Sequence, residues 1–171
     1  RFRRHEHQRE FLGLAGDQIL LGDVADVLVD VLLDAGDGEF AFVVGLGGAG
    51  GFAAQLAAAT QELKDAGLDV VPLAGDITSP ETLRAIAAEL GRQGGLAACA
   101  HAAGLSGSMA DPERVMSVNL GGTARLLDAL LPLANEGAGV VCFSSQSAHL
   151  WGAAASADVR RILDEPQAPD L

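Results

Sequence analysis

Residues 42–51 read Phe42-Val43-Val44-Gly45-Leu46-Gly47-Gly48-Ala49-Gly50-Gly51, and an alanine-rich segment with helical character comes after them. A short apolar strand that leads into a glycine loop and then into a helix is typical of proteins that bind the pyrophosphate of a dinucleotide. Glycines let the backbone approach the phosphates, while the first N–H groups of the helix are unpaired donors at its positive dipole end. The loop therefore predicts a nucleotide-binding site.

The spacing of the loop fits two templates. Gly45, Gly47 and Gly50 form Gly-x-Gly-x-x-Gly, whereas Gly45, Ala49 and Gly51 form Gly-x-x-x-Ala-x-Gly. The chain holds 22 glycines, so neither match is decisive without the strands and helices that should surround it. The assignment depends on the sequence beyond the loop.

Length and composition limit the number of domains and the classes of partner that the protein can bind. A chain of 171 residues that is 49% hydrophobic can bury one core, but it is short for a complete two-half dinucleotide fold. Its 23 acidic residues against 11 Lys and Arg give a net charge of −12, which repels phosphodiester backbones and anionic lipid. We expect neither nucleic acid nor a membrane surface as a partner.

Localisation and metal binding are also predicted from absences in the sequence. No apolar run approaches the roughly 20 residues that cross a bilayer, and no secretory signal begins the chain, so we expect a soluble, cytoplasmic protein. Cys99 and Cys142 lie in apolar segments and predict buried, reduced thiols. His101 and His149 lack a ligand at metal-binding spacing, so we expect no metal site.

Residues 1–38 differ in character from the rest of the chain and are assigned as an N-terminal extension, with residues 39–171 as a partial dinucleotide-binding domain. Arg1, Arg3, Arg4 and Arg9 form a basic head that is typical of a solvated terminus. Apolar residues from Leu21 to Leu32 then recur at helical spacing between aspartates, which favours an acidic amphipathic helix. A strand through 27–29 is the alternative, because a short valine-rich run fits both periods.

Beyond the glycine loop, strands and helices alternate. The pattern predicts a helix over 52–66, a strand over 68–73, a helix opened by Ser79-Pro80, a strand over 96–100, a helix over 111–134 and a strand over 140–143. Such alternation indicates parallel strands joined by helical crossovers. The predicted fold is Rossmann-like α/β, with three α/β/α layers around a parallel sheet.

The motifs in residues 40–171 resemble, in the correct order, those of the short-chain dehydrogenase/reductase family. The resemblance implies that NAD or NADP binds through Gly45, Gly47, Gly48, Ala49, Gly50 and Gly51, with Val44 where the family has threonine. It implies that Asp76 and Ile77 hold the adenine, and that His101, Ala102, Ala103 and Gly104 stand at the family's Asn-Asn-Ala-Gly. Asn119 matches the structural and proton-relay asparagine, and Ser145 matches the catalytic serine.

Four short segments of the sequence are similar to those of a bacterial subgroup related to hydroxysteroid dehydrogenases and carbonyl reductases. The similar segments are 103–106, 109–111, 147–150 and 159–166, the last of which looks like an insertion that precedes the catalytic tyrosine. The subgroup implies an alcohol/ketone pair as substrate. The chain itself contains no tyrosine, and its lone lysine is Lys64, far from the expected position. Without the proton donor we expect no turnover.

A second departure is one of length. Only the 24 residues 52–75 separate Gly51 from Asp76, where the family fits helix, strand, helix and strand. One strand-helix unit is therefore absent or has been replaced, and the C-terminal strands are expected to be missing. The resemblance implies that the missing strand is the one that selects between NAD and NADP. One hypothesis puts the apolar segment from Val24 to Leu33 in the vacant strand position.

Two functions remain open from the sequence. The first is an NAD(P)-dependent oxidoreductase of the short-chain type, here a fragment that is inactive alone. The alternative is a non-catalytic nucleotide-binding or interaction protein derived from that family, and a third hypothesis is a chain without a stable fold. Missing strands would expose the apolar residues of 140–143, so we expect a homo-oligomer if the chain folds.

Overall fold

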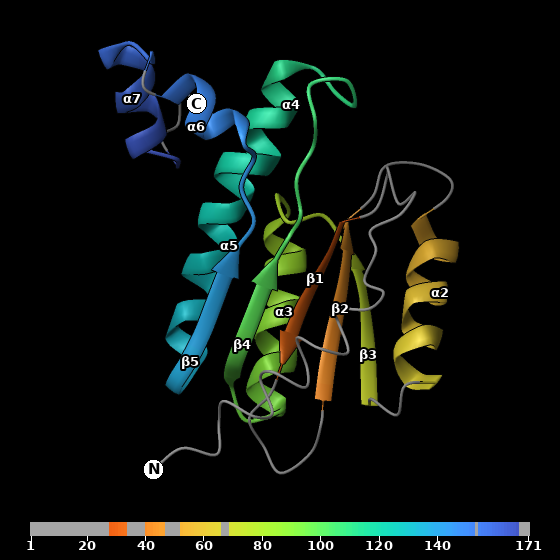
Figure 1. Ribbon diagram of the computed structural model, residues 1–171. Coiled ribbons are helices and arrows are strands. Elements are labelled where there is room, and N and C mark those ends of the chain that lie inside the picture. Colours follow the sequence, from red (N-terminus) through yellow and green to blue (C-terminus); the bar gives the residue numbers. More distant parts are fainter. Residues whose placement is uncertain (1–27, 34–39, 47–51, 66–68, 153, 168–171) are drawn as a thin grey trace.

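The structure is a computed structural model in which residues 28–33, 40–46, 52–65, 69–152 and 154–167 are described (Figure 1). The strands are β1 (Leu28–Leu33), β2 (Phe40–Leu46), β3 (Asp69–Gly75), β4 (Leu96–His101) and β5 (Ala134–Cys142). The α-helices are α2 (Phe52–Asp65), α3 (Pro80–Arg92), α4 (Pro112–Met116), α5 (Thr123–Leu130), α6 (Ser147–Gly152) and α7 (Ala157–Asp164). A π-helical segment, η1 (Ser117–Gly122), joins α4 to α5, and a 3-10 turn, η2 (Leu131–Leu133), follows α5.

The five strands form one sheet in the order β3-β2-β1-β4-β5. β2 pairs with β3 and β4 pairs with β5, both in parallel, whereas β1 is antiparallel to β2 on one side and to β4 on the other. Four strands therefore run in one direction and β1 runs against them, as the arrows in Figure 1 show. The Rossmann-like α/β prediction is confirmed, and the parallel sheet carries one antiparallel strand.

Helices cover both faces of the sheet. The main core joins Leu83, Ile86 and Leu90 of α3, Leu96 and Cys99 of β4, and Leu126 and Leu130 of α5, with Val71 and Leu73 of β3 packed against them. Buried Val70 is one residue out of phase with Val71, so it faces the opposite side of β3, and α2 contacts β3 and β2. Figure 1 shows α2 apart from α3 and α5, which fits the predicted three layers.

Local sequence signals explain why the helices begin and end where they do. Ser79 caps α3, since its Oγ accepts hydrogen bonds from the N–H groups of Glu81 and Thr82, and Pro80 occupies the first helical position. Gly94 and Gly95 have φ angles of +99° and +111°, which lets the chain turn sharply from α3 into β4. The predicted α2, α3, β3 and β4 are confirmed within a few residues.

The N-terminal prediction needs correction. Residues 28–33 form strand β1, so the favoured helical interpretation is wrong for this segment and the alternative, a strand, is right, although it lies further along the chain than 27–29. Periodicity could not separate them, and backbone pairing with β2 and β4 selects the strand. Residues 1–27, including the basic head, lie outside the described residues, and the division at residue 38 stays a prediction.

The hypothesis for the vacant strand position is half correct. The segment does enter the sheet, but not between the strands on either side of the shortened interval, because β2 pairs directly with β3 along its whole length, from Phe40 opposite Asp69 to Leu46 opposite Gly75. It enters on the other side of β2, next to β4. Pro72 of β3 has no N–H to donate, which suits a strand at the edge of the sheet.

Only one of the two cysteines is buried, although the sequence predicted that both would be. Cys99 is buried in the core, as expected, but Cys142 is exposed at the end of β5. β5 is an edge strand in the described sheet, so residues near its end lack the cover that a further strand would supply. The prediction of a buried thiol is therefore wrong for Cys142.

One tight contact in this fold predicts a measurable cost. A Cβ atom on Gly122 of η1 would lie 2.7 Å from Cδ1 and Cγ1 of Ile77, which is fully buried. We expect Gly122→Ala to lower the free energy of unfolding by about 1–3 kcal/mol in urea titrations, because a filled core must shift to admit the methyl group. Gly91→Ala in α3 is the matched control, since a Cβ there meets nothing within 4 Å. Equal effects of the two substitutions would contradict the packing.

Candidate functional site

The carboxyl ends of the four parallel strands gather most of the predicted site residues at one edge of the sheet. Gly45 lies near the end of β2, Asp76 directly follows β3, His101 ends β4, and Ser145 lies three residues beyond β5. In open α/β sheets this edge is where ligands bind. Gly47, Gly48, Ala49, Gly50 and Gly51 lie outside the described residues, and α2 begins at Phe52, immediately after them.

A small apolar cluster joins the segments after β3 and β4 to η1. Ile77, Ala103 and Val118 are buried together, and Leu105 packs against them. The Ile77 side chain is therefore part of the packing, and any contact with adenine is left to the backbone of this segment. Asp76, Ala102 and Gly104 flank the cluster, so these three segments hold fixed positions relative to one another.

Asn119 braces the same region through both ends of its side-chain amide. Its Oδ1 accepts a hydrogen bond of 2.6 Å from the N–H of Leu105, and its Nδ2 donates one of 2.8 Å to the Leu105 carbonyl. The same oxygen would lie 3.3 Å from a Cβ on Gly104, so this glycine lets the loop approach the amide closely. Asn119 sits in the π-helical segment, a deviation that occurs frequently at functional sites.

His101 is buried and its side chain points to α5 rather than to open solvent. Its Nε2 lies 2.8 Å from Oγ1 of Thr123, which itself donates to the Asn119 carbonyl at 2.8 Å. Because the single hydroxyl hydrogen of Thr123 is used, Nε2 of His101 carries the hydrogen in this arrangement. The His101 carbonyl accepts from the N–H of Phe143 at 2.9 Å, which holds the end of β5 beside the end of β4.

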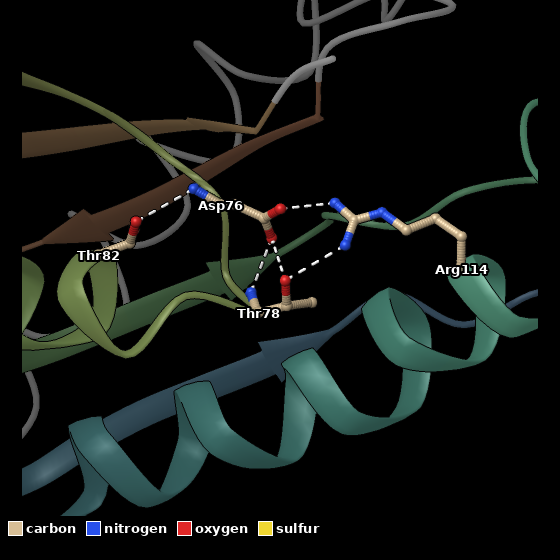
Figure 2. A network of polar contacts seen from close by, with 4 residues as sticks. All are labelled: Asp76, Thr78, Thr82 and Arg114. Atoms are coloured by element: carbon tan, nitrogen blue, oxygen red, sulfur yellow. Dashed lines mark hydrogen bonds and ion pairs between the residues drawn. The ribbon is translucent and has the colours of Figure 1, made fainter. Parts of the chain in front are cut away.

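Asp76 is held by four polar contacts (Figure 2). Its Oδ1 accepts hydrogen bonds from the N–H and the hydroxyl of Thr78, at 2.8 and 2.7 Å, and its Oδ2 pairs with Arg114 at 2.5 Å. Arg114 also donates to Oγ1 of Thr78, while the Asp76 N–H donates to Oγ1 of Thr82. The carboxylate therefore closes a local turn and binds α4, and both of its oxygens already accept hydrogen bonds.

The network changes the acidity of Asp76. Partial burial raises the pKa of this carboxyl, but the hydrogen bonds from Thr78 and the charge of Arg114 together outweigh burial and hold the pKa below its ordinary value of 3.8. Asp76 thus stays ionised through the neutral range. Arg114 and Thr78 were not among the predicted site residues, although Thr78 stands two positions after Asp76, where an aspartate-capped turn would use it.

Ser145 is exposed and belongs to the turn that opens α6. Its Oγ accepts from the N–H of Ser147 and donates to the Ser147 hydroxyl, both at 3.1 Å. No described tyrosine or lysine stands beside it, since the chain has no tyrosine and Lys64 lies near the far end of α2, about 18 Å along the helix from Phe52. The role of Ser145 as the catalytic serine stays a prediction of the family resemblance.

Other sites are not found in the part of the chain that the structure describes. In these residues no three His, Cys, Asp or Glu side chains gather closely enough to hold a metal ion. Among the described helices, none is long and apolar enough to cross a membrane. The group that the resemblance implies is a nicotinamide dinucleotide, which binds at the ends of parallel strands. In this chain β1 lies between β2 and β4, where the crevice for it would open.

The class of protein follows from this combination of fold and strand-end residues. Residues 49–158 match the profile of the family described as enoyl-(acyl carrier protein) reductase, and this match covers more than half of the chain. The chain belongs to this enoyl-(acyl carrier protein) reductase-like family of short-chain dehydrogenases/reductases. None of the curated proteins matches it. Membership supports an oxidoreductase of the short-chain type.

The ion pair at Asp76 predicts a pH-dependent stability difference. Its two side chains are 44% and 41% exposed, so solvent screening limits the pair to about 0.5–1 kcal/mol. A lowered folded-state pKa stabilises above the unfolded value, and this contribution is lost as pH falls through the folded pKa. We expect Asp76→Asn to destabilise by about that amount at pH 7 and the difference to shrink below pH 3.8.

Urea titrations of four proteins measure this effect: the parent chain, Asp76→Asn, Arg114→Gln and the double variant. If the pair contributes, the double variant loses less stability than the sum of the two single variants. Glu62→Gln on the exposed face of α2 is the control for removing a carboxylate. Additive losses, or a difference that persists unchanged at acid pH, would contradict the interaction.

Proposed function

We propose that this chain is the cofactor-binding part of an NAD(P)-dependent oxidoreductase that acts on an alcohol/ketone pair. The observation that carries the proposal is the meeting of Asp76, the 101–105 segment and the end of β5 at one edge of parallel strands, in a member of an oxidoreductase family. In this proposal Asp76 and Ile77 line the adenine end, and His101, Ala102, Ala103 and Gly104 line the next part of the cleft through their backbone.

Ser145 and Asn119 are the proposed catalytic residues. The Ser145 hydroxyl would polarise a substrate oxygen, and its exposure supports access from solvent. Asn119 would hold the loop at Leu105 and offer its carbonyl region, already bonded by Thr123, to a proton relay. The cofactor would supply or accept a hydride when bound. With no tyrosine in the chain, the proton donor is absent, so we propose that the chain alone does not turn over substrate.

The missing proton donor favours a second candidate function, a non-catalytic nucleotide-binding or interaction protein derived from this family. The position of Lys64 supports it, because that side chain lies near the opposite end of α2 from the glycine loop and cannot replace a lysine beside Ser145. The two candidates share cofactor binding and differ in chemistry. A substrate that is steroid-like remains part of the first proposal, and the family description adds an enoyl thioester as a class to assay.

Cofactor binding is the first test. We expect saturable binding of NADH or NADPH in fluorescence titrations of the 171-residue chain, checked by calorimetry, and its loss in Gly45→Asp or Gly51→Asp, since a carboxylate would face the phosphates. Gly91→Asp, on α3 where nothing lies within 4 Å of a Cβ, is the matched control and should bind normally. No binding by a folded chain would overturn the proposal.

Turnover assays test the proposed inactivity once binding is measured. We expect no oxidation of NADH or NADPH with a steroid-like ketone or with an enoyl thioester above the rate without protein. Steady consumption of either substrate would contradict inactivity, and the double bond that is reduced would identify the substrate class. Binding without turnover is compatible with both candidates. In that case the oxidoreductase proposal requires that a tyrosine and a lysine from additional chain restore the reaction.

We also propose that the chain self-associates through β5. Val140, Val141 and Phe143 are 37%, 58% and 68% exposed, and β5 is hydrogen-bonded along one side in the described sheet. The apolar exposed residues lie at the C-terminal end of this edge strand, where an unpaired backbone can pair with the same segment of a second copy. We expect Val141→Glu to reduce the dimer fraction in sedimentation velocity, whereas Val159→Glu on α7 leaves it unchanged. A parent chain that is monomeric at all concentrations would sink this proposal.

A further inference from the structure

The position of β1 is the most consequential feature that the family relationship does not explain. From the boundary between β2 and β4 the parallel strands proceed outward in opposite directions, to β3 on one side and to β5 on the other. Such a reversal of strand order is where a dinucleotide lies in a doubly wound sheet. β1 fills this boundary, so the ends of β2 and β4 lie on either side of an inserted strand.

The insertion widens the boundary by one strand. Neighbouring strands lie about 4.8 Å apart, so β2 and β4 are separated by roughly twice that distance. β1 begins at the edge of the sheet that holds the candidate site, where β2 ends, and runs toward the opposite edge. Its first residue, Leu28, pairs with Leu46, the last residue of β2. In this arrangement β1 stands in the way of a dinucleotide that crosses from the end of β2 to the end of β4.

The strands on either side of β1 are already aligned to pair with each other. Both are antiparallel to β1, so β2 and β4 are parallel to one another. Val31 of β1 pairs with Val43 on one side and with Ala100 on the other, which places these two residues level across the gap. If β1 left, β2 and β4 could close by a sideways movement of about one strand spacing, with no sliding along the strands.

The result of that closure is a simpler sheet than the one observed. It would have the order β3-β2-β4-β5 with all strands parallel, and every strand end of the candidate site would lie one position from the next. One residue of β1 is unfavourable in a central strand. The sequence of β1, Leu-Val-Asp-Val-Leu-Leu, includes Asp30, a residue type that is depleted in strands, at a position paired with Val44 of β2 in the middle of the sheet.

We propose that β1 is a removable strand that closes the cofactor crevice, and that the chain binds a nicotinamide dinucleotide after β1 leaves and β2 pairs with β4. This inference rests on the proposed function and adds a form of control to it. The structure describes the closed state. Cofactor affinity then equals the intrinsic affinity reduced by the fraction of molecules in which β1 has left, so holding or releasing β1 must change the apparent dissociation constant.

A disulfide lock tests the closed state directly. Val31→Cys with Val43→Cys, and separately Asp30→Cys with Val44→Cys, join residues that are paired across β1 and β2. Directly opposed residues in antiparallel strands have Cα atoms about 4.5 or 5.5 Å apart, and both separations suit a disulfide. Both locks are built on Cys142→Ser, because that thiol is exposed. The single-cysteine variants and the reduced form of each lock are the matched controls.

A strand-breaking variant tests the open state. Val31→Pro removes a backbone N–H at a position that is paired with both neighbouring strands, and proline is not accommodated in a central strand. Ala157→Pro is its control, since that residue occupies the first helical position of α7, away from the sheet (Figure 1), where proline is tolerated. Circular dichroism and urea titration verify that each variant is folded, and hydrogen exchange of β1, β2 and β4 reports which strands remain paired.

Fluorescence titration with NADH and NADPH then decides between three results. The proposal requires that the oxidised locks bind at least tenfold more weakly than the same proteins after reduction, and that Val31→Pro binds at least tenfold more tightly than the parent chain. Equal binding by locked, reduced and proline-containing chains would overturn the removable strand and leave the proposed function intact. Absence of binding in every folded chain, Val31→Pro included, would overturn the proposed function and this inference with it.

Discussion

Backbone hydrogen bonding along both sides of β1 connects the two halves of the sheet. One half is the β2–β3 pair with α2, and the other is the β4–β5 pair. Side chains add a second connection on one face, where Val71 and Leu73 of β3 pack against the same cluster that holds α3, β4 and α5. The sheet could therefore lose the backbone connection and keep the hydrophobic one. For this reason β1 can control the separation of β2 and β4 without being the element that holds the core together.

The helices after the glycine loop could be predicted because their signals are local. Ser79 and Pro80 determine the start of α3 by capping geometry alone, and the alternation of strands and helices implies crossovers whatever the partners are. β1 could not be predicted in the same way. Its six residues fit a helix or a strand, and the choice depends on hydrogen bonds to β2 and to β4, which lies more than 60 residues further along the chain.

In the candidate site, too, local contacts could be predicted from the sequence and long-range contacts could not. The turn at Asp76 uses Thr78, two residues away, so the local contact is implied by the sequence, whereas the ion pair with Arg114 joins residues 38 apart and has no sequence signature. Asn119 joins η1 to the segment after β4 through its two bonds to Leu105, and its role in a proton relay stays a prediction. A buried His101 bonded to Thr123 was not predicted, since nothing in the sequence pairs positions 22 residues apart.

Two features that depart from the family, the absence of tyrosine and the position of β1, would act on different steps of the proposed function. In the proposed function the absence of tyrosine removes the proton donor, so it would limit chemistry without limiting affinity. The insertion of β1 separates the ends of β2 and β4, between which the proposed dinucleotide would lie, so in the proposal it limits affinity without changing the chemical groups. A chain under both constraints retains the shape of an oxidoreductase domain while its binding is governed by a strand. Control of binding, rather than catalysis, is then the property that β1 makes possible.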